Sequence, residues 1–142
     1  MEAMKTNNRL RCFSLPFTFI IFATIAFAGP DEKQERNKSA TQVATTWFTS
    51  LMQGQTAVTT SLSAVPFSVD GKQEVKTLAD LKKLYDQVVE KKGKRDLKPA
   101  SVEVKSSSPE KVTVILMIEG DDEGIAISIK PGEAFRVVGF TD

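Results

Sequence analysis

The 142-residue sequence contains no histidine and a single cysteine, Cys12. Without an imidazole the chain cannot form the usual Ser-His-Asp triad, and it lacks the ring nitrogens that many metal sites use. Cys12 lies in a segment that we expect to be removed, so the remaining domain would have neither a disulfide nor thiol chemistry. Its stability must therefore come from its hydrophobic core.

Clustered positive charge is also scarce. Lys and Arg together number 19, Asp and Glu together number 18, and the one basic cluster is residues 91–95. This cluster follows a predicted helix, where cations stabilise the unpaired carbonyls and Gly93 is a natural C-cap. We expect no nucleic-acid partner, because phosphate binding needs a broader array of cations.

Motifs for cofactors and metals are missing as well. The sequence has no glycine-rich phosphate loop. The acidic residues 121–123 lie between Gly120 and Gly124 and lack the alternating spacing of calcium ligands, so we interpret them as a solvated turn. We expect neither a cofactor nor a metal.

The N-terminus has the pattern of a secretory signal peptide, which we assign to residues 1–28. Three basic residues precede an apolar run at 13–27, and small residues at 26 and 28 suit cleavage between Ala28 and Gly29. The alternative is a retained membrane anchor, but Pro16 and a run shorter than the roughly 20 residues of a spanning helix disfavour it. The basic residues of the leader are Lys5, Arg9 and Arg11.

Cleavage would leave a nearly neutral exported protein. Removing Glu2 and the three basic residues of the leader from the totals leaves 16 basic and 17 acidic residues. We expect the product to be secreted or periplasmic, and the sequence leaves open which. Residues 29–38 are mostly polar and predict a flexible lead-in. Asn37-Lys38-Ser39 matches the glycosylation pattern, and whether Asn37 is modified also stays open.

Three helices are predicted in the domain that follows. Ser39 resembles an N-cap for a first helix with Trp47 on its apolar face, and Gly54 ends it. Residues 55–64 predict a short second helix that Pro66 breaks. Thr77 resembles the N-cap of a third helix at 77–92, because apolar residues follow it at helical spacing.

Strand patterns occupy the remaining residues. Asp70-Gly71 predicts a tight hairpin turn between short antiparallel strands. Alternating apolar residues after Pro99 then predict four strands in a meander. We therefore expect an α+β fold in which N-terminal helices pack on a curved four-stranded antiparallel sheet.

The second face of this sheet also carries apolar side chains. Strict alternation places Ile115, Met117, Val138 and Phe140 on the face turned away from the helices. Because a soluble monomer rarely exposes a large apolar patch, we expect a homodimer that packs through this face.

The order of these elements resembles that of the nuclear transport factor 2-like (SnoaL-like) superfamily. The resemblance covers residues 39–142 as a single domain and rests on Trp47-Phe48, Gly54-Gln55 and the stretch from Pro66 to the hairpin turn. It implies an α+β cone with a cavity between the helices and the sheet. A cystatin-like fold is the alternative, but it offers no place for a helix between the hairpin and the meander.

This resemblance leaves two functions open. We assign Trp47, Phe67, Asp70 and Tyr85 to a pocket for a small apolar ligand, and a protein partner is equally compatible with a non-catalytic binding domain. The alternative is a cofactor-independent lyase or isomerase with a buried carboxylate as base. The enzyme requires Asp70 and Tyr85 to meet in one enclosed cavity, whereas helical spacing favours a core position for Tyr85.

Overall fold

The computed structural model describes residues 16–120 and 122–142, and the side chains from residue 31 onward. The chain divides into two compact units, Met1–Gln34 and Glu35–Asp142, and the second unit contains every described strand. The predicted cleavage site and the whole predicted leader, residues 1–28, lie outside the residues whose side chains are described. Over the described residues, no helix is both long enough and apolar enough to cross a membrane.

The first helix, α1 (Pro16–Met52), is longer than the sequence predicts. Ser39 lies inside α1, so its assignment as the N-cap is wrong, and residues 29–38 are helical where we expected a flexible lead-in. Glu, Lys, Gln and Arg dominate that segment, and their favourable helix propensities explain the extension. Further along, hydroxyl groups donate to carbonyls three or four residues back, as Thr45 Oγ1 does to the Thr41 carbonyl at 2.8 Å.

A short helix and a hairpin follow. The short helix α2 (Thr56–Ser61) is confirmed, but the strand β1 (Ser63–Val69) begins immediately after it and contains Pro66. The prediction that Pro66 ends the helix is therefore wrong. The pairing register between β1 and its neighbour β6 breaks between Ser63 and Ser68, so the missing N–H of Pro66 falls where the ladder is already interrupted. The hairpin is completed by β2 (Gln73–Val75).

The third helix, α3 (Leu78–Lys92), has the ends that the sequence predicts. Thr77 is extended, and its hydroxyl accepts a hydrogen bond from the backbone N–H of Asp80 at 3.1 Å. Gly93 follows with φ 78°, a left-handed value that favours glycine, and its N–H donates to the Val89 carbonyl. Both local signals are confirmed.

The meander is also present, as β3 (Ser101–Ser107), β4 (Val112–Met117), β5 (Ile125–Lys130) and β6 (Arg136–Thr141). However, the sheet has six strands in the order β2-β1-β6-β5-β4-β3, and β1 runs parallel to β6. The sheet is therefore mixed, and the prediction of four antiparallel strands is wrong in its finer part. Gly139 permits the close approach of the two parallel strands, because a Cβ there would lie 2.8 Å from the Ser68 carbonyl oxygen.

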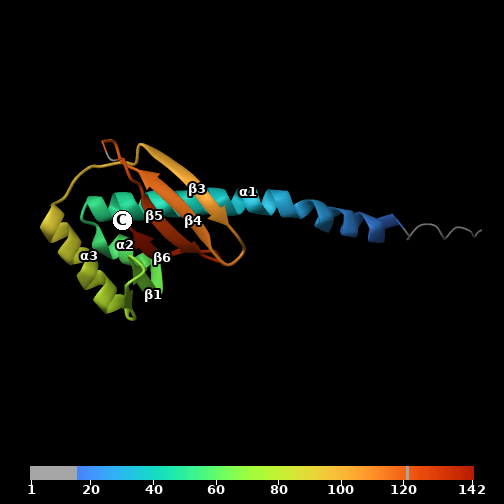
Figure 1. The fold of residues 1–142 in the computed structure, drawn as a ribbon. Coiled ribbons are helices and arrows are strands. Elements are labelled where there is room, and N and C mark those ends of the chain that lie inside the picture. Colours follow the sequence, from blue (N-terminus) through green and yellow to red (C-terminus); the bar gives the residue numbers. More distant parts are fainter. Residues whose placement is uncertain (1–15, 121) are drawn as a thin grey trace, which may run out of the picture. The chain divides into compact units, whose positions relative to one another are not determined.

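One hydrophobic core lies between the helices and one face of the sheet (Figure 1). Buried residues recur at helical spacing along the second half of α1, and α3 adds Leu81 and Tyr85. Alternate residues of the strands complete the core. The buried apolar residues from α1 and the meander are Ala40, Ala44, Trp47, Phe48, Leu51, Val112, Val114, Leu116, Ile127, Ile129 and Val137. The α+β class is thus shown.

Candidate functional site

Three of the four predicted pocket residues come together in this core. Trp47, Phe67 and Tyr85 are joined by Phe140, and we call these four the aromatic cluster. The ring centroids of Trp47 and Tyr85 lie 6.0 Å apart at 76°, and those of Phe67 and Tyr85 lie 6.0 Å apart at 89°. Such edge-to-face pairs are favourable arrangements of aromatic rings. The predicted residues therefore contact one another directly.

A directed chain of hydrogen bonds runs through the aromatic cluster. Trp47 Nε1 donates to Tyr85 Oη at 3.1 Å, and Ser63 Oγ donates to the Thr59 carbonyl at 2.7 Å. The single proton of Ser63 is thereby used, so the 2.8 Å contact between Tyr85 Oη and Ser63 Oγ must have Tyr85 as its donor. The phenol of Tyr85 accepts one hydrogen bond and donates one, and its proton is committed within the core.

Burial makes this phenol a weak acid. Tyr85 is 1% exposed, and desolvation raises its pKa to about 12, although the hydrogen bond that it accepts from Trp47 acts in the opposite direction. The side chain is therefore neutral at physiological pH. It is also closed off from a substrate, because Trp47 is 2% exposed and Phe67 is 0% exposed.

The polar groups continue away from the aromatic cluster. Ser50 Oγ and Thr59 Oγ1 lie 2.8 Å apart, and each also lies within hydrogen-bond distance of a backbone carbonyl three or four residues earlier in the chain. The two hydroxyl groups have one proton each but make three contacts. One of them must therefore donate both to its carbonyl and to the other hydroxyl. Sequence reasoning missed Ser50, Thr59 and Ser63. The sequence contained one sign of these contacts. Ser50 lies three residues after Trp47 on the buried face of α1, and a buried hydroxyl group needs a hydrogen-bond partner.

The fourth predicted pocket residue, Asp70, lies elsewhere. It is exposed in the β1–β2 turn with φ 55°, and its Oδ1 accepts a hydrogen bond from the backbone N–H of Asp142 at 3.0 Å. Its own N–H donates to the Phe140 carbonyl at 2.8 Å. Asp70 therefore joins the hairpin turn to the end of β6 and does not join the aromatic cluster.

Carboxylates are absent from the interior of the described part of the chain. Every Asp and Glu with a described side chain is exposed, and the buried polar residues are hydroxyl-bearing. The pKa of Asp86 is lowered by a hydrogen bond from Thr56 at 2.6 Å and by Lys82, but this carboxylate is solvent-exposed. The same described residues contain no group of three or more acidic, histidine or cysteine side chains that could hold a metal. No described carboxylate has the environment of a buried base.

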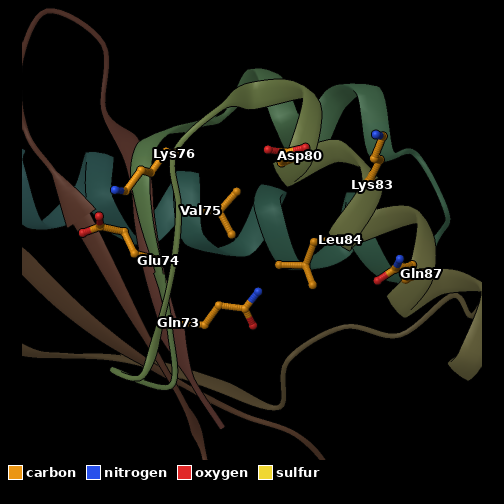
Figure 2. Close-up of a pocket in the computed structure, with 8 residues that line it drawn as sticks. All are labelled: Gln73, Glu74, Val75, Lys76, Asp80, Lys83, Leu84 and Gln87. Atoms are coloured by element: carbon orange, nitrogen blue, oxygen red, sulfur yellow. The ribbon is translucent and has the colours of Figure 1, made fainter.

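An open groove lies between β2 and α3, and we call it the β2–α3 groove (Figure 2). Its volume is about 410 Å³, and it carries two carboxylates, two ammonium groups and two amides around an apolar pair. Its lining residues are Gln73, Glu74, Val75, Lys76, Asp80, Lys83, Leu84 and Gln87. No member of the aromatic cluster lines it, so the sequence-based pocket and the observed groove are different places.

The predicted dimer face is altered by an irregularity in β6. Ile129 pairs with Val137 and Ile127 pairs with Phe140, so β6 contains one extra residue between these pairs. Because Ile127 and Ile129 are both buried on the core side, Phe140 lies on that side too, with its ring centroid 5.7 Å from that of Trp47. Phe140 therefore does not belong to the outer face, and strict alternation failed at this bulge.

The other members of that face keep positions compatible with the prediction. Ile115 and Met117 are half-buried on β4, next to Gly124, where a Cβ would lie 2.6 Å from Ile115 Cγ2. Val138 is half-buried at the bulge. The apolar surface available for a face-to-face homodimer is thus smaller than the sequence predicts.

The glycosylation pattern at Asn37 lies within α1. Its side chain is half-buried, and Oδ1 is inaccessible and has no hydrogen-bond partner. An acceptor asparagine is normally presented on an exposed surface. The folded domain does not present Asn37 in that way.

Comparison with known proteins adds no identification to this geometry. No protein-family model matches the chain, and no curated protein matches it.

Proposed function

We propose that the chain is exported, processed between Ala28 and Gly29, and then acts as a non-catalytic binding domain of the nuclear transport factor 2-like kind. The order of helices, hairpin, third helix and meander supports this family, and α3 occupies the place that a cystatin-like fold lacks. Of the two ligand classes that the sequence leaves open, the geometry favours a protein partner over a small apolar molecule.

The closed packing of the aromatic cluster carries this choice. An internal ligand would have to contact the residues assigned to the pocket, but Trp47, Phe67 and Tyr85 are at most 2% exposed and pack on one another. Side chains fill the region where the family resemblance implies a cavity. Recognition would then use the surface, where small side-chain changes suffice for docking.

The enzyme alternative has less support. It needs a buried carboxylate near a phenol with a free proton, whereas Asp70 is exposed and Tyr85 donates its proton to Ser63. General base catalysis also requires the base to reach the proton that it removes. Asp70 contacts Asp142 and Tyr85 contacts Ser63, so the two side chains take part in separate structural interactions.

Fluorescence tests the proposal directly, because Trp47 is the only tryptophan in the chain. We expect no saturable change in its emission when folded protein is titrated with dodecanoate or anilinonaphthalene sulfonate. The Trp47→Phe variant gives the background of the probes. A saturable change in Trp47 emission, without loss of far-ultraviolet circular dichroism, would show that a small ligand enters the aromatic cluster and would overturn the choice of a protein partner.

A further inference from the structure

Both edges of the sheet carry the same tripeptide. Among the described strands, the order β2-β1-β6-β5-β4-β3 leaves β2 and β3 each with one side that pairs with no other strand. Glu74-Val75-Lys76 begins in β2 and continues one residue beyond it, and Glu103-Val104-Lys105 lies in β3. In both, the valine is turned toward the core and the charged residues are exposed. An unpaired edge of this kind is a template for another strand.

The tripeptide is self-complementary when two copies run antiparallel. A two-fold axis through Val75 would place Glu74 opposite Lys76 of a second copy, and the same pair would recur on the other side of the axis. Residues two apart in a strand share one face of the sheet, so both pairs would form on the exposed face. Opposite charges directly across two strands are stabilising, and like charges are destabilising.

The edge at β3 is protected against such pairing. The register between β3 and β4 shifts between Val104 and Ser106, so Lys105 lies at an irregularity in the strand. Bulges at an edge twist the strand away from a neighbour, and an edge lysine acts in the same direction. The three pairs between β1 and β2 show no register shift. Of the two edges, β2 is the regular one.

The β2–α3 groove provides space beside this regular edge. Figure 2 shows β2 on one side of the groove and the α3 side chains of Asp80, Lys83, Leu84 and Gln87 on the other. Its carboxylates and ammonium groups balance, because Glu74 and Asp80 match the two lysines in number. A balanced surface of alternating sign disfavours a strongly acidic or basic partner and suits a copy of itself.

We propose that the free edge of β2 docks a second copy of this chain. The two β2 strands pair antiparallel around Val75, the Glu74 and Lys76 side chains form two reciprocal ion pairs, and Leu84 adds apolar contact from α3. The axis is two-fold, so the assembly closes as a dimer and does not continue into a filament. Because β2 has three residues, the interface is small and association needs high protein concentration.

Charge reversal gives a sharp test by sedimentation. Glu74→Lys and Lys76→Glu should each weaken self-association by about tenfold or more, since each replaces two attractive pairs by two repulsive ones. An equimolar mixture of the two variants should form a heterodimer, because every pair in it again joins opposite charges. The Glu74→Lys/Lys76→Glu double variant should regain wild-type association. Circular dichroism of each variant checks that it is folded.

Matched variants at the opposite edge and on the sheet face decide between surfaces. Glu103→Lys and Lys105→Glu make the same charge changes at β3, and they should leave the dimer intact. A wild-type protein that is monomeric at about 1 mM, or a mixture of the two β2 variants that does not associate, would overturn the proposal. Dissociation by Met117→Lys combined with indifference to Glu74→Lys would also overturn it, by placing the contact on the outer face of the sheet.

Discussion

Trp47 Nε1 donates its hydrogen bond to Tyr85 Oη at 3.1 Å, and the two rings meet edge to face with centroids 6.0 Å apart. The contact joins α1 to α3 across 38 residues of sequence. The phenol is thereby both a packing element and the acceptor that allows an indole N–H to be buried. This double role makes Tyr85 important for stability.

Replacement of Tyr85 by phenylalanine should destabilise the domain by about 1–3 kcal/mol, because it leaves Trp47 Nε1 buried without an acceptor. Urea unfolding followed by circular dichroism measures the loss. A double-mutant cycle with Trp47→Phe provides the control, since the penalty of Tyr85→Phe should shrink once the indole N–H is gone. An unchanged penalty in that background would contradict the assigned hydrogen bond.

The single tyrosine also allows a clean alkaline titration. Burial raises the pKa of Tyr85 from 10.0 to about 12, so the folded state favours the protonated phenol. A raised folded pKa gives stability that is present below pH 10 and is lost as the pH rises toward 12. The loss should reach roughly 2–3 kcal/mol.

Absorbance at 295 nm follows this ionisation without interference from another phenol, because the sequence has one tyrosine. We expect the midpoint to lie above pH 10 and to coincide with unfolding. The Tyr85→Phe variant should lack the corresponding pH dependence of unfolding, which assigns that dependence to Tyr85. A midpoint near pH 10 in protein that is still folded would show that the phenol reaches solvent.

Local signals in the sequence predicted local structure well. Thr77 and Gly93 bound α3 because a side-chain oxygen and a left-handed backbone act within one helical turn. Alternation predicted the strands of the meander, since each buries one face. Trp47, Phe67 and Tyr85, which the sequence assigned to a pocket, pack on one another in the core, and each is at most 2% exposed.

The errors arise from interactions that no local pattern encodes. Parallel pairing of β1 and β6 joins Val69 to Phe140, far apart in the sequence, and adds the predicted hairpin to the sheet of the predicted meander. One extra residue near Val138 reverses the alternation in β6 and turns Phe140 toward the core side of the sheet. The hydrogen bonds of Ser63 depend on three elements that meet only in the folded chain. The sequence around Ser63 therefore did not predict them.

Truncation of Trp47 to alanine should destabilise the domain by about 3–5 kcal/mol, the range for removing a large buried aromatic side chain. The side chain is 2% exposed and contacts both Tyr85 and Phe140. Val58→Ala is a suitable control, because Val58 is 42% exposed and its truncation should change stability by less than about 0.5 kcal/mol. A loss below about 1 kcal/mol at Trp47 would contradict its place in the core.

Export can be tested through the N-terminus of the mature protein. Mass spectrometry of exported protein should find Gly29 as its first residue, because small residues precede that bond after the apolar run. Ala28→Arg should block processing, since a bulky charged residue does not fit a pocket for small side chains. Purified membrane-bound protein that retains residues 1–28 would contradict the proposed cleavage.

Asp70 offers a test of how the hairpin is joined to the end of the sheet. Its left-handed φ of 55° and its hydrogen bond to the Asp142 N–H make separate demands on the residue. Asp70→Asn should keep both, because asparagine tolerates this conformation and its amide oxygen can accept the bond. Asp70→Gly should keep the backbone geometry and lose the bond, at about 0.5–1.5 kcal/mol. Asp70→Ala should be the least stable of the three, since it loses the bond and adds backbone strain. Urea unfolding of the series decides the matter: equal stability of the asparagine and glycine variants would show that the hydrogen bond to the chain end contributes nothing measurable.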